Sequence, residues 1–145
     1  MLTLSDIHIT FNAGTATEVR ALRGISLDIA EGEFVTVIGS NGAGKSTLLS
    51  TVVGTAKPDT GTIHLAGNDV TNWPAAKRAR LVGRVFQEPR LGTCSSLSIE
   101  ENLALAASRG KNRGLKLALG KRGQKQLFAE HLEKLGLGLE HRMAT

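Results

Sequence analysis

Hydrophobic and polar residues alternate along much of the first thirty positions, which is the pattern of half-buried β-strands. The alternation runs over residues 2–11, apart from a slip near Ser5 and Asp6, and it returns over residues 25–29. A shorter strand is predicted over residues 62–65, after a turn that contains proline and glycine. Because turns connect these segments, the N-terminal part of the chain is predicted to be antiparallel β structure.

The next pattern is a strand followed by a helix. Residues 34–38 form a nearly continuous apolar run, as expected for an interior strand of a parallel sheet. Apolar residues then recur at helical spacing, which predicts a helix that begins near Gly44 and ends at Gly54. Residues 82–86 predict one further strand.

Three more helices are predicted in the second half of the chain. Proline at position 74 opens a short helix over residues 74–79. Ser98 and Glu101 form a capping-box pattern ahead of a helix over residues 99–109. A last helix is predicted over residues 124–135, where apolar side chains share one face.

Composition narrows the class of protein. The chain has 145 residues and is 41% hydrophobic, but no apolar run approaches the roughly 20 residues that span a bilayer. The single cysteine, Cys94, excludes an internal disulfide. The N-terminus lacks the basic start and apolar core of a secretory signal, so we expect one soluble, cytoplasmic domain.

The net charge of +5 is unevenly distributed, because residues 102–129 contain no acidic residue and many basic ones. Such a stretch is either a solvated surface or a face for nucleic acid or anionic lipid. The aromatic content of 3% leaves little for stacking on bases, which favours the solvated surface.

One segment carries most of the chemical information, because it matches the phosphate-binding pattern G-x-x-x-x-G-K-[ST] at every constrained position. Glycines allow the backbone to wrap around an anion, and the N-terminus of the following helix favours negative charge. The predicted nucleotide-binding residues are Gly39, Ser40, Asn41, Gly42, Ala43, Gly44, Lys45, Ser46 and Thr47.

Several segments together resemble the ATP-binding subunits of ABC (ATP-binding cassette) transporters. The resemblance rests on Ala21–Ile29, Glu31–Phe34, Gly39–Thr47, Val85–Pro89 and Leu97–Leu103, and it covers essentially the whole chain. It implies an α/β fold of the P-loop NTPase type, with a partial core sheet, an N-terminal antiparallel β portion and a helical subdomain. It also implies that ATP and Mg²⁺ bind.

The resemblance assigns roles by position. Lys45 and Gln87 are the catalytic residues, and Ser46 and Gln87 contact Mg²⁺. Phe11 matches the aromatic residue that stacks on adenine, although the family more often has tyrosine there. The alternatives are a strand-end core residue for Phe11 and an ordinary turn residue for Gln87.

The sequence also departs from the family. It contains no L-S-G-G-Q signature, no apolar strand that ends in an Asp-Glu pair, and no switch histidine after them. It therefore looks like the N-terminal half of a nucleotide-binding domain, with residues 1–97 as the β and loop portion and residues 98–145 as the start of the helical subdomain. Strands flanking residues 34–38 would be missing, which leaves ladder groups and apolar side chains exposed.

The resemblance implies ATP-dependent solute transport, and it favours import by a bacterial system of the amino-acid type. The implied partners are a membrane-spanning permease, a second ATP-binding subunit and an extracytoplasmic solute-binding protein, with the chain at the inner face of the membrane. Two alternatives stay open. One is a nucleotide-binding remnant without hydrolysis, and the other is a cytosolic ABC ATPase that acts on nucleic acid or ribosomes.

Overall fold

A computed structural model describes residues 1–109 and 122–139. The chain forms two compact units, residues 1–83 and residues 84–145. The division at residue 97 that the sequence suggested stays a prediction. Within the described residues, no helix is both long and apolar enough to cross a bilayer.

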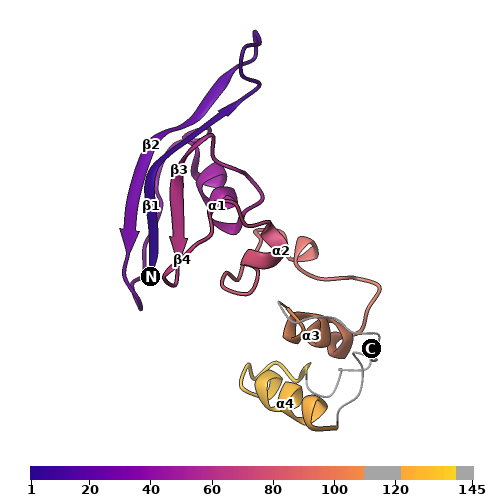
Figure 1. Ribbon diagram of the computed structural model, residues 1–145. Helices are drawn as coiled ribbons and strands as arrows, with labels where there is room; N and C mark the ends of the chain where they lie inside the picture. The colour runs from indigo at the N-terminus through magenta and orange to yellow at the C-terminus, as the bar shows by residue number, and fades with distance from the viewer. Residues whose placement is uncertain (110–121, 140–145) are drawn as a thin grey trace. The chain divides into compact units, whose positions relative to one another are not determined.

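The first unit contains the antiparallel β structure that the sequence predicted. The strands β1 (Leu2–Phe11), β2 (Val19–Ile29), β3 (Thr60–Leu65) and β4 (Asn68–Asp69) form one sheet in the order β2-β1-β3-β4. All three strand pairs are antiparallel (Figure 1). The second strand begins six residues before the predicted segment, because irregular pairing hides the alternation there.

The slip predicted in the first strand is an irregularity of the sheet. The register between β1 and β2 shifts between Leu4 and Ile7. Asp6 lies in this shift with φ of 51°, and its backbone N–H donates to Ser26 Oγ at 3.0 Å. A Cβ on Gly61 would collide with the backbone carbonyls of the shifted segment, so glycine is needed where β3 passes it.

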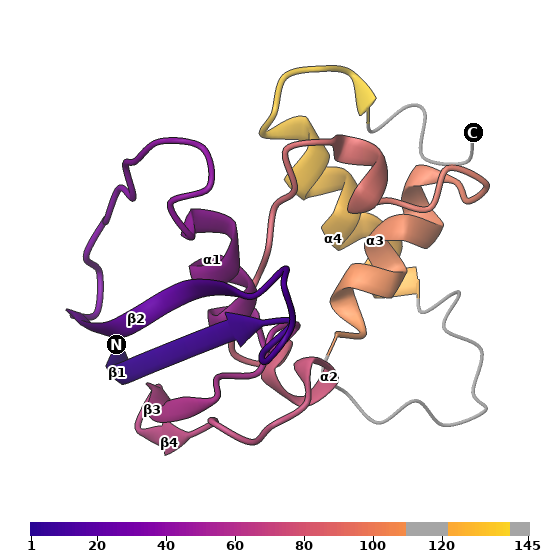
Figure 2. The same ribbon diagram turned by 90° about the horizontal axis from the view of Figure 1, so that it is seen from above.

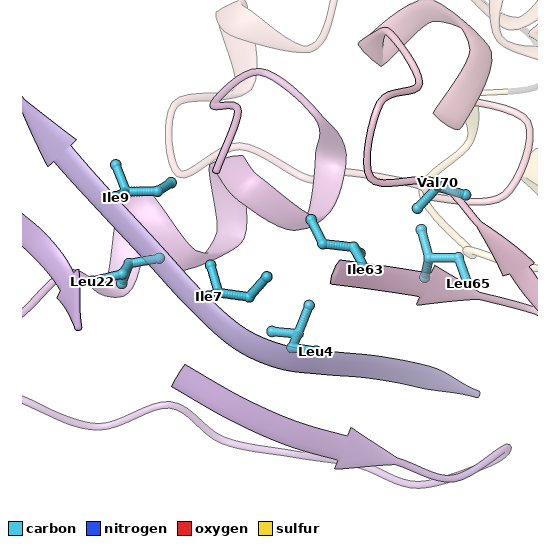
Figure 3. Packing of buried hydrophobic residues seen from close by; sticks show 7 residues of the cluster. All are labelled: Leu4, Ile7, Ile9, Leu22, Ile63, Leu65 and Val70. Atoms are coloured by element: carbon cyan, nitrogen blue, oxygen red, sulfur yellow. The ribbon is translucent and has the colours of Figure 1, made fainter. Parts of the chain in front are cut away.

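The core of this unit lies on one face of the sheet (Figure 3). The helix α1 (Lys45–Val53) contributes Leu48 and Val52 to this core. Gly54 ends α1 in the left-handed conformation, as predicted, with φ of 85°. The buried residues of the core are Leu4, Ile7, Ile9, Leu22, Ile63, Leu65 and Val70.

The prediction of a buried parallel strand over residues 34–38 is wrong for this structure. The segment has no strand pairing, and Phe34 and Ile38 are 92% and 89% exposed. Figure 2 shows it as a trace that leaves β2 and returns to α1 without joining the sheet. The physical reason is the one anticipated from the sequence, because no described strand lies beside it to exchange hydrogen bonds.

The strand predicted over residues 82–86 is also absent, although the structure describes all of these residues. Val85 is 97% exposed, so its apolar side chain has no covering layer. An isolated apolar segment gains neither ladder hydrogen bonds nor burial, and both are needed to stabilise a strand.

The helices follow the sequence closely. The short helix α2 (Ala75–Arg78) belongs to the first unit, while η1 (Pro89–Leu91), α3 (Ile99–Ala107) and α4 (Arg122–Glu133) belong to the second. The capping box of α3 is confirmed, because Ser98 Oγ accepts from the Glu101 N–H at 3.3 Å and the Glu101 carboxylate accepts from the Ser98 N–H at 2.8 Å. The buried residues between α3 and α4 are Ala104, Phe128 and Leu132.

The middle of the basic stretch, positions 110–121, lies outside the described residues. On the two sides of this gap, Arg109 is exposed, and Lys125 forms an ion pair with Glu100, with Nζ and Oε2 3.4 Å apart. The choice between a solvated surface and a binding face therefore stays a prediction.

Candidate nucleotide-binding site

The glycine-rich loop turns sharply between the extended segment and α1. Gly42 and Gly44 have φ of 83° and 89°, which residues with a side chain rarely adopt. The Ala43 N–H donates to the Ser40 carbonyl at 3.2 Å and closes the turn. A Cβ on Gly39 would lie 3.3 Å from the Ala43 Cβ, so the two sides of the loop approach each other closely.

The end of the loop rests directly on β2. A Cβ on Gly44 would lie 2.6 Å from the carbonyl oxygen of Ala21 and 3.1 Å from Leu22 Cδ2. Only glycine fits there, and the contact fixes the N-terminal end of α1 against the sheet. The sequence did not reveal Ala21 and Leu22 as this platform, because nothing in a strand pattern tells which backbone a later glycine will touch.

Lys45 directs its ammonium group back into the loop. Its Nζ donates to the carbonyl oxygens of Gly39 and Ser40, both at 2.7 Å. An ammonium group has three N–H donors, so one remains for a bound anion. The loop therefore combines a held positive charge with backbone that curls around it.

The first turn of α1 is suited to an anion. No side chain caps the N-terminus at Gly44, and the first turn contains no acidic residue, so its backbone N–H groups are open and the positive end of the helix dipole is not neutralised. Ser46 is exposed in this turn and offers a hydroxyl oxygen. These donors fit a phosphate group.

The same residues fit Mg²⁺ only as a companion of phosphate. The described residues contain no group of three His, Cys, Asp or Glu side chains that could hold a metal ion. The Ser46 hydroxyl supplies one oxygen, and Mg²⁺ prefers oxygen ligands from phosphates and water for the rest.

Phe11 lies in the same unit as the loop. It ends β1 opposite Val19 and is 44% exposed. Because alternate residues of a strand share a face, Phe11 is on the same side of β1 as Ile9. Ile9 pairs with Leu22, the residue whose side chain approaches Gly44. The structure therefore places Phe11 about 7 Å along the strand from this pair.

Gln87 belongs to the other unit, and the two units are each described by themselves. Its side chain is exposed, just after residues 82–86, which form no strand. The proposed roles of Gln87 at Mg²⁺ and at the attacking water, and that of Phe11 at adenine, stay predictions.

Comparison with known proteins agrees with this geometry. Residues 22–144 match the protein family described as "ABC transporter". The chain belongs to this family. The predicted resemblance and the α/β fold of the ABC type are thus confirmed.

Among curated ABC relatives, the chain is 50% identical to a tyrosine transport ATP-binding protein of Clostridioides difficile (strain R20291), over 95 residues that make up 66% of this chain and 38% of the relative. It is 39% identical to the methionine import ATP-binding protein MetN of Brucella abortus (strain 2308), over 127 residues that make up 83% of this chain and 31% of the relative. The chain thus spans about a third of the length of these relatives.

A solved ABC structure covers nearly the whole chain. It is a dimeric post-hydrolysis state of the ATP-binding cassette MJ0796 bound to ADP and Pi, with a TM-score of 0.77 and 28% sequence identity. The match covers 99% of this chain and 60% of that one.

Proposed function

We propose that this chain binds Mg²⁺-ATP as the nucleotide-binding portion of an ABC transporter's ATP-binding subunit. The observation that carries the proposal is the loop over residues 39–44. Its left-handed glycines, the ammonium group of Lys45 inside the curve and the uncapped N-terminus of α1 converge on one place. Few ligands other than a phosphate chain use all three.

The residues have separate tasks in this proposal. Loop amides from residues 39 to 47 and Lys45 hold the β- and γ-phosphates, and the Ser46 hydroxyl binds Mg²⁺. When bound, Mg²⁺ neutralises charge on the phosphate oxygens. Phe11 offers a half-exposed ring for adenine at the end of β1. By the family resemblance alone, Gln87 would touch Mg²⁺ and the attacking water.

Hydrolysis needs more than these residues. Phosphoryl transfer to water requires a group that orients or deprotonates the water and a carboxylate that helps to hold the metal. The 145 residues contain no apolar run that ends in an Asp-Glu pair. We therefore infer that the chain alone binds nucleotide with little or no turnover, which is also the second candidate function.

In a complete transporter, ATP binding and hydrolysis would drive solute import through a separate permease. Two relatives are named for tyrosine transport and methionine import, which supports an amino-acid cargo. The proposed partners are the permease, a second ATP-binding subunit and an extracytoplasmic solute-binding protein. This assembly would place the chain at the inner face of the cell membrane.

The proposal is tested by equilibrium dialysis of labelled ATP with Mg²⁺ against the wild-type chain and two lysine variants. Lys45→Ala removes a charged hydrogen-bond donor, so we expect binding weaker by about 10- to 100-fold. Lys57→Ala removes an exposed lysine beyond α1 and should bind as the wild type does. Equal binding by both variants, or none by the folded wild type, would refute the proposal. Phosphate release measured in parallel separates binding alone from turnover.

A further inference from the structure

Arg78, in α2, has a buried side chain with an unusual set of partners. It is 1% exposed, although arginine is rarely fully buried. Its guanidinium donates to four backbone carbonyl oxygens. Nη1 donates to Thr51 at 2.6 Å and to Val52 at 3.2 Å, Nη2 to Thr71 at 3.0 Å, and Nε to Trp73 at 3.2 Å.

These four carbonyls belong to two different segments. Thr51 and Val52 lie in the last turn of α1, where carbonyl groups lack the N–H partner four residues on that the helix would supply. The Thr51 carbonyl also accepts from the N–H of Gly54 at 3.2 Å. Thr71 and Trp73 lie in the connection between β4 and α2. Arg78 therefore joins the C-terminal end of α1 to this connection, and its positive charge favours the negative end of the helix dipole.

The charge persists despite burial. Burial lowers the pKa of Arg78, while the nearby carboxylate of Asp69 raises it. A guanidinium group stays protonated at neutral pH even after such a shift. The contact with α1 is therefore charge-assisted throughout the ordinary pH range.

The end of α1 is shaped to receive this group. A Cβ on Gly54 would lie 2.9 Å from Arg78 Nε and 3.0 Å from its Cδ. Gly54 also has φ of 85°, which ends the helix. The glycine thus both terminates α1 and leaves room for the guanidinium.

The opposite end of α1 carries the phosphate loop. A helix of nine residues is a short rigid rod of roughly 13 Å, so movement at one end is passed to the other. At the N-terminal end, Gly44 rests on β2. Core packing of Leu48 and Val52 holds the middle, and Arg78 holds the far end.

We propose that Arg78 is a positioning residue for nucleotide binding. By fastening the C-terminal end of α1 to the β4–α2 connection, it keeps Lys45 and the first amides of α1 in the geometry that grips phosphate. This inference rests on the proposed function of the loop. Lysine cannot replace arginine fully, because it has three N–H donors in place of a planar fork with five.

The test compares Arg78→Met and Arg78→Lys with Arg80→Met, which removes an exposed arginine two residues away. Affinity for Mg²⁺-ATP is measured at a temperature where circular dichroism shows each protein to be folded. We expect affinity weaker by about tenfold for Arg78→Met, a smaller loss for Arg78→Lys, and no change for Arg80→Met. Without nucleotide, amides at the start of α1 should exchange hydrogen faster in both Arg78 variants, while those of β1 should not.

A purely structural role would lower the melting temperature and leave the affinity of the folded protein unchanged. That result, with unaltered exchange at the start of α1, would overturn the inference. If Arg78→Met does not fold, Arg78→Lys decides by the same two measurements. If the wild-type chain itself binds no Mg²⁺-ATP, the proposed function fails and this inference fails with it.

Discussion

Two apolar segments of the first unit differ in structure, because one forms a buried strand and the other forms none. In β1, Ile7 is completely buried, and the strand pairs with β2 on one side and β3 on the other. In the extended segment over residues 34–38, Ile38 is 89% exposed and the backbone has no strand partner. Both segments are rich in strand-forming residues. An apolar sequence therefore supplies the tendency to form a strand, while neighbouring strands decide whether it becomes one.

The largest difference should appear when the same side chain is truncated in each segment. Ile7→Ala leaves a cavity in the core and should lower the free energy of unfolding by about 2–5 kcal/mol. Ile38→Ala changes an exposed residue and should alter it by less than about 0.5 kcal/mol. Urea unfolding measures both values.

Equal losses for the two variants would show that residues 34–38 are packed in solution. If Ile7→Ala proves too unstable to measure, the pair Ile7→Val and Ile38→Val replaces it. The expected loss for Ile7→Val is then about 0.5–1.5 kcal/mol.

A smaller effect is expected where the sheet is tightest. Gly61 and Gly67 both have positive φ, of 96° and 78°, but only Gly61 lies against the carbonyls of β1. Gly67→Ala should cost about 1 kcal/mol from backbone conformation alone. Gly61→Ala adds a collision with backbone and should cost about 2–4 kcal/mol. Thermal unfolding of the two variants checks the order, and a reversed order would contradict the observed register of β1 and β3.

The smallest effect on stability is expected for Asp69, which lies in a chain of hydrogen bonds beside β3. The Ile63 N–H donates to Thr71 Oγ1 at 2.8 Å, and the Thr71 hydroxyl and N–H donate to Asp69 Oδ1 at 2.6 and 2.9 Å. These two hydrogen bonds from Thr71 lower the pKa of Asp69 in the folded state. The stabilisation is therefore present above the pKa of the unfolded chain, about 4, and is lost as pH falls through the lower folded value.

We expect the urea midpoint of the wild type to fall between about pH 5 and pH 2 more steeply than that of Asp69→Asn. Asp28→Asn, at an exposed position on β2, serves as the control and should keep the wild-type slope. If Asp69→Asn follows the same curve as the wild type, the carboxylate does not contribute through these hydrogen bonds.

The sequence predicted the local features of the fold well. The slip at Asp6, the glycine that ends α1 at Gly54, and the capping box at Ser98 each depend on neighbouring residues and were each confirmed. The strands predicted over residues 34–38 and 82–86 were not confirmed, because a strand needs neighbouring strands, which a local pattern does not contain.

In the candidate site, too, local features could be predicted from the sequence and distant contacts could not. The loop around Lys45 could be located from its spacing, while its role in binding nucleotide stays a prediction. The contact of Gly44 with Ala21 and the burial of Arg78 could not be predicted from the sequence, since each depends on contacts between distant segments. In a chain with 18 Lys and Arg residues, no sequence signal separates Arg78 from the exposed ones.

The most direct measurement is a calorimetric titration of the folded chain with ATP in the presence of Mg²⁺, repeated with adenosine. Because the loop offers amides and an ammonium group to phosphates, we predict saturable heat with Mg²⁺-ATP and none with adenosine over the same concentration range. No saturable heat with Mg²⁺-ATP, or equal heat with adenosine, would contradict the proposal that this loop holds a phosphate chain.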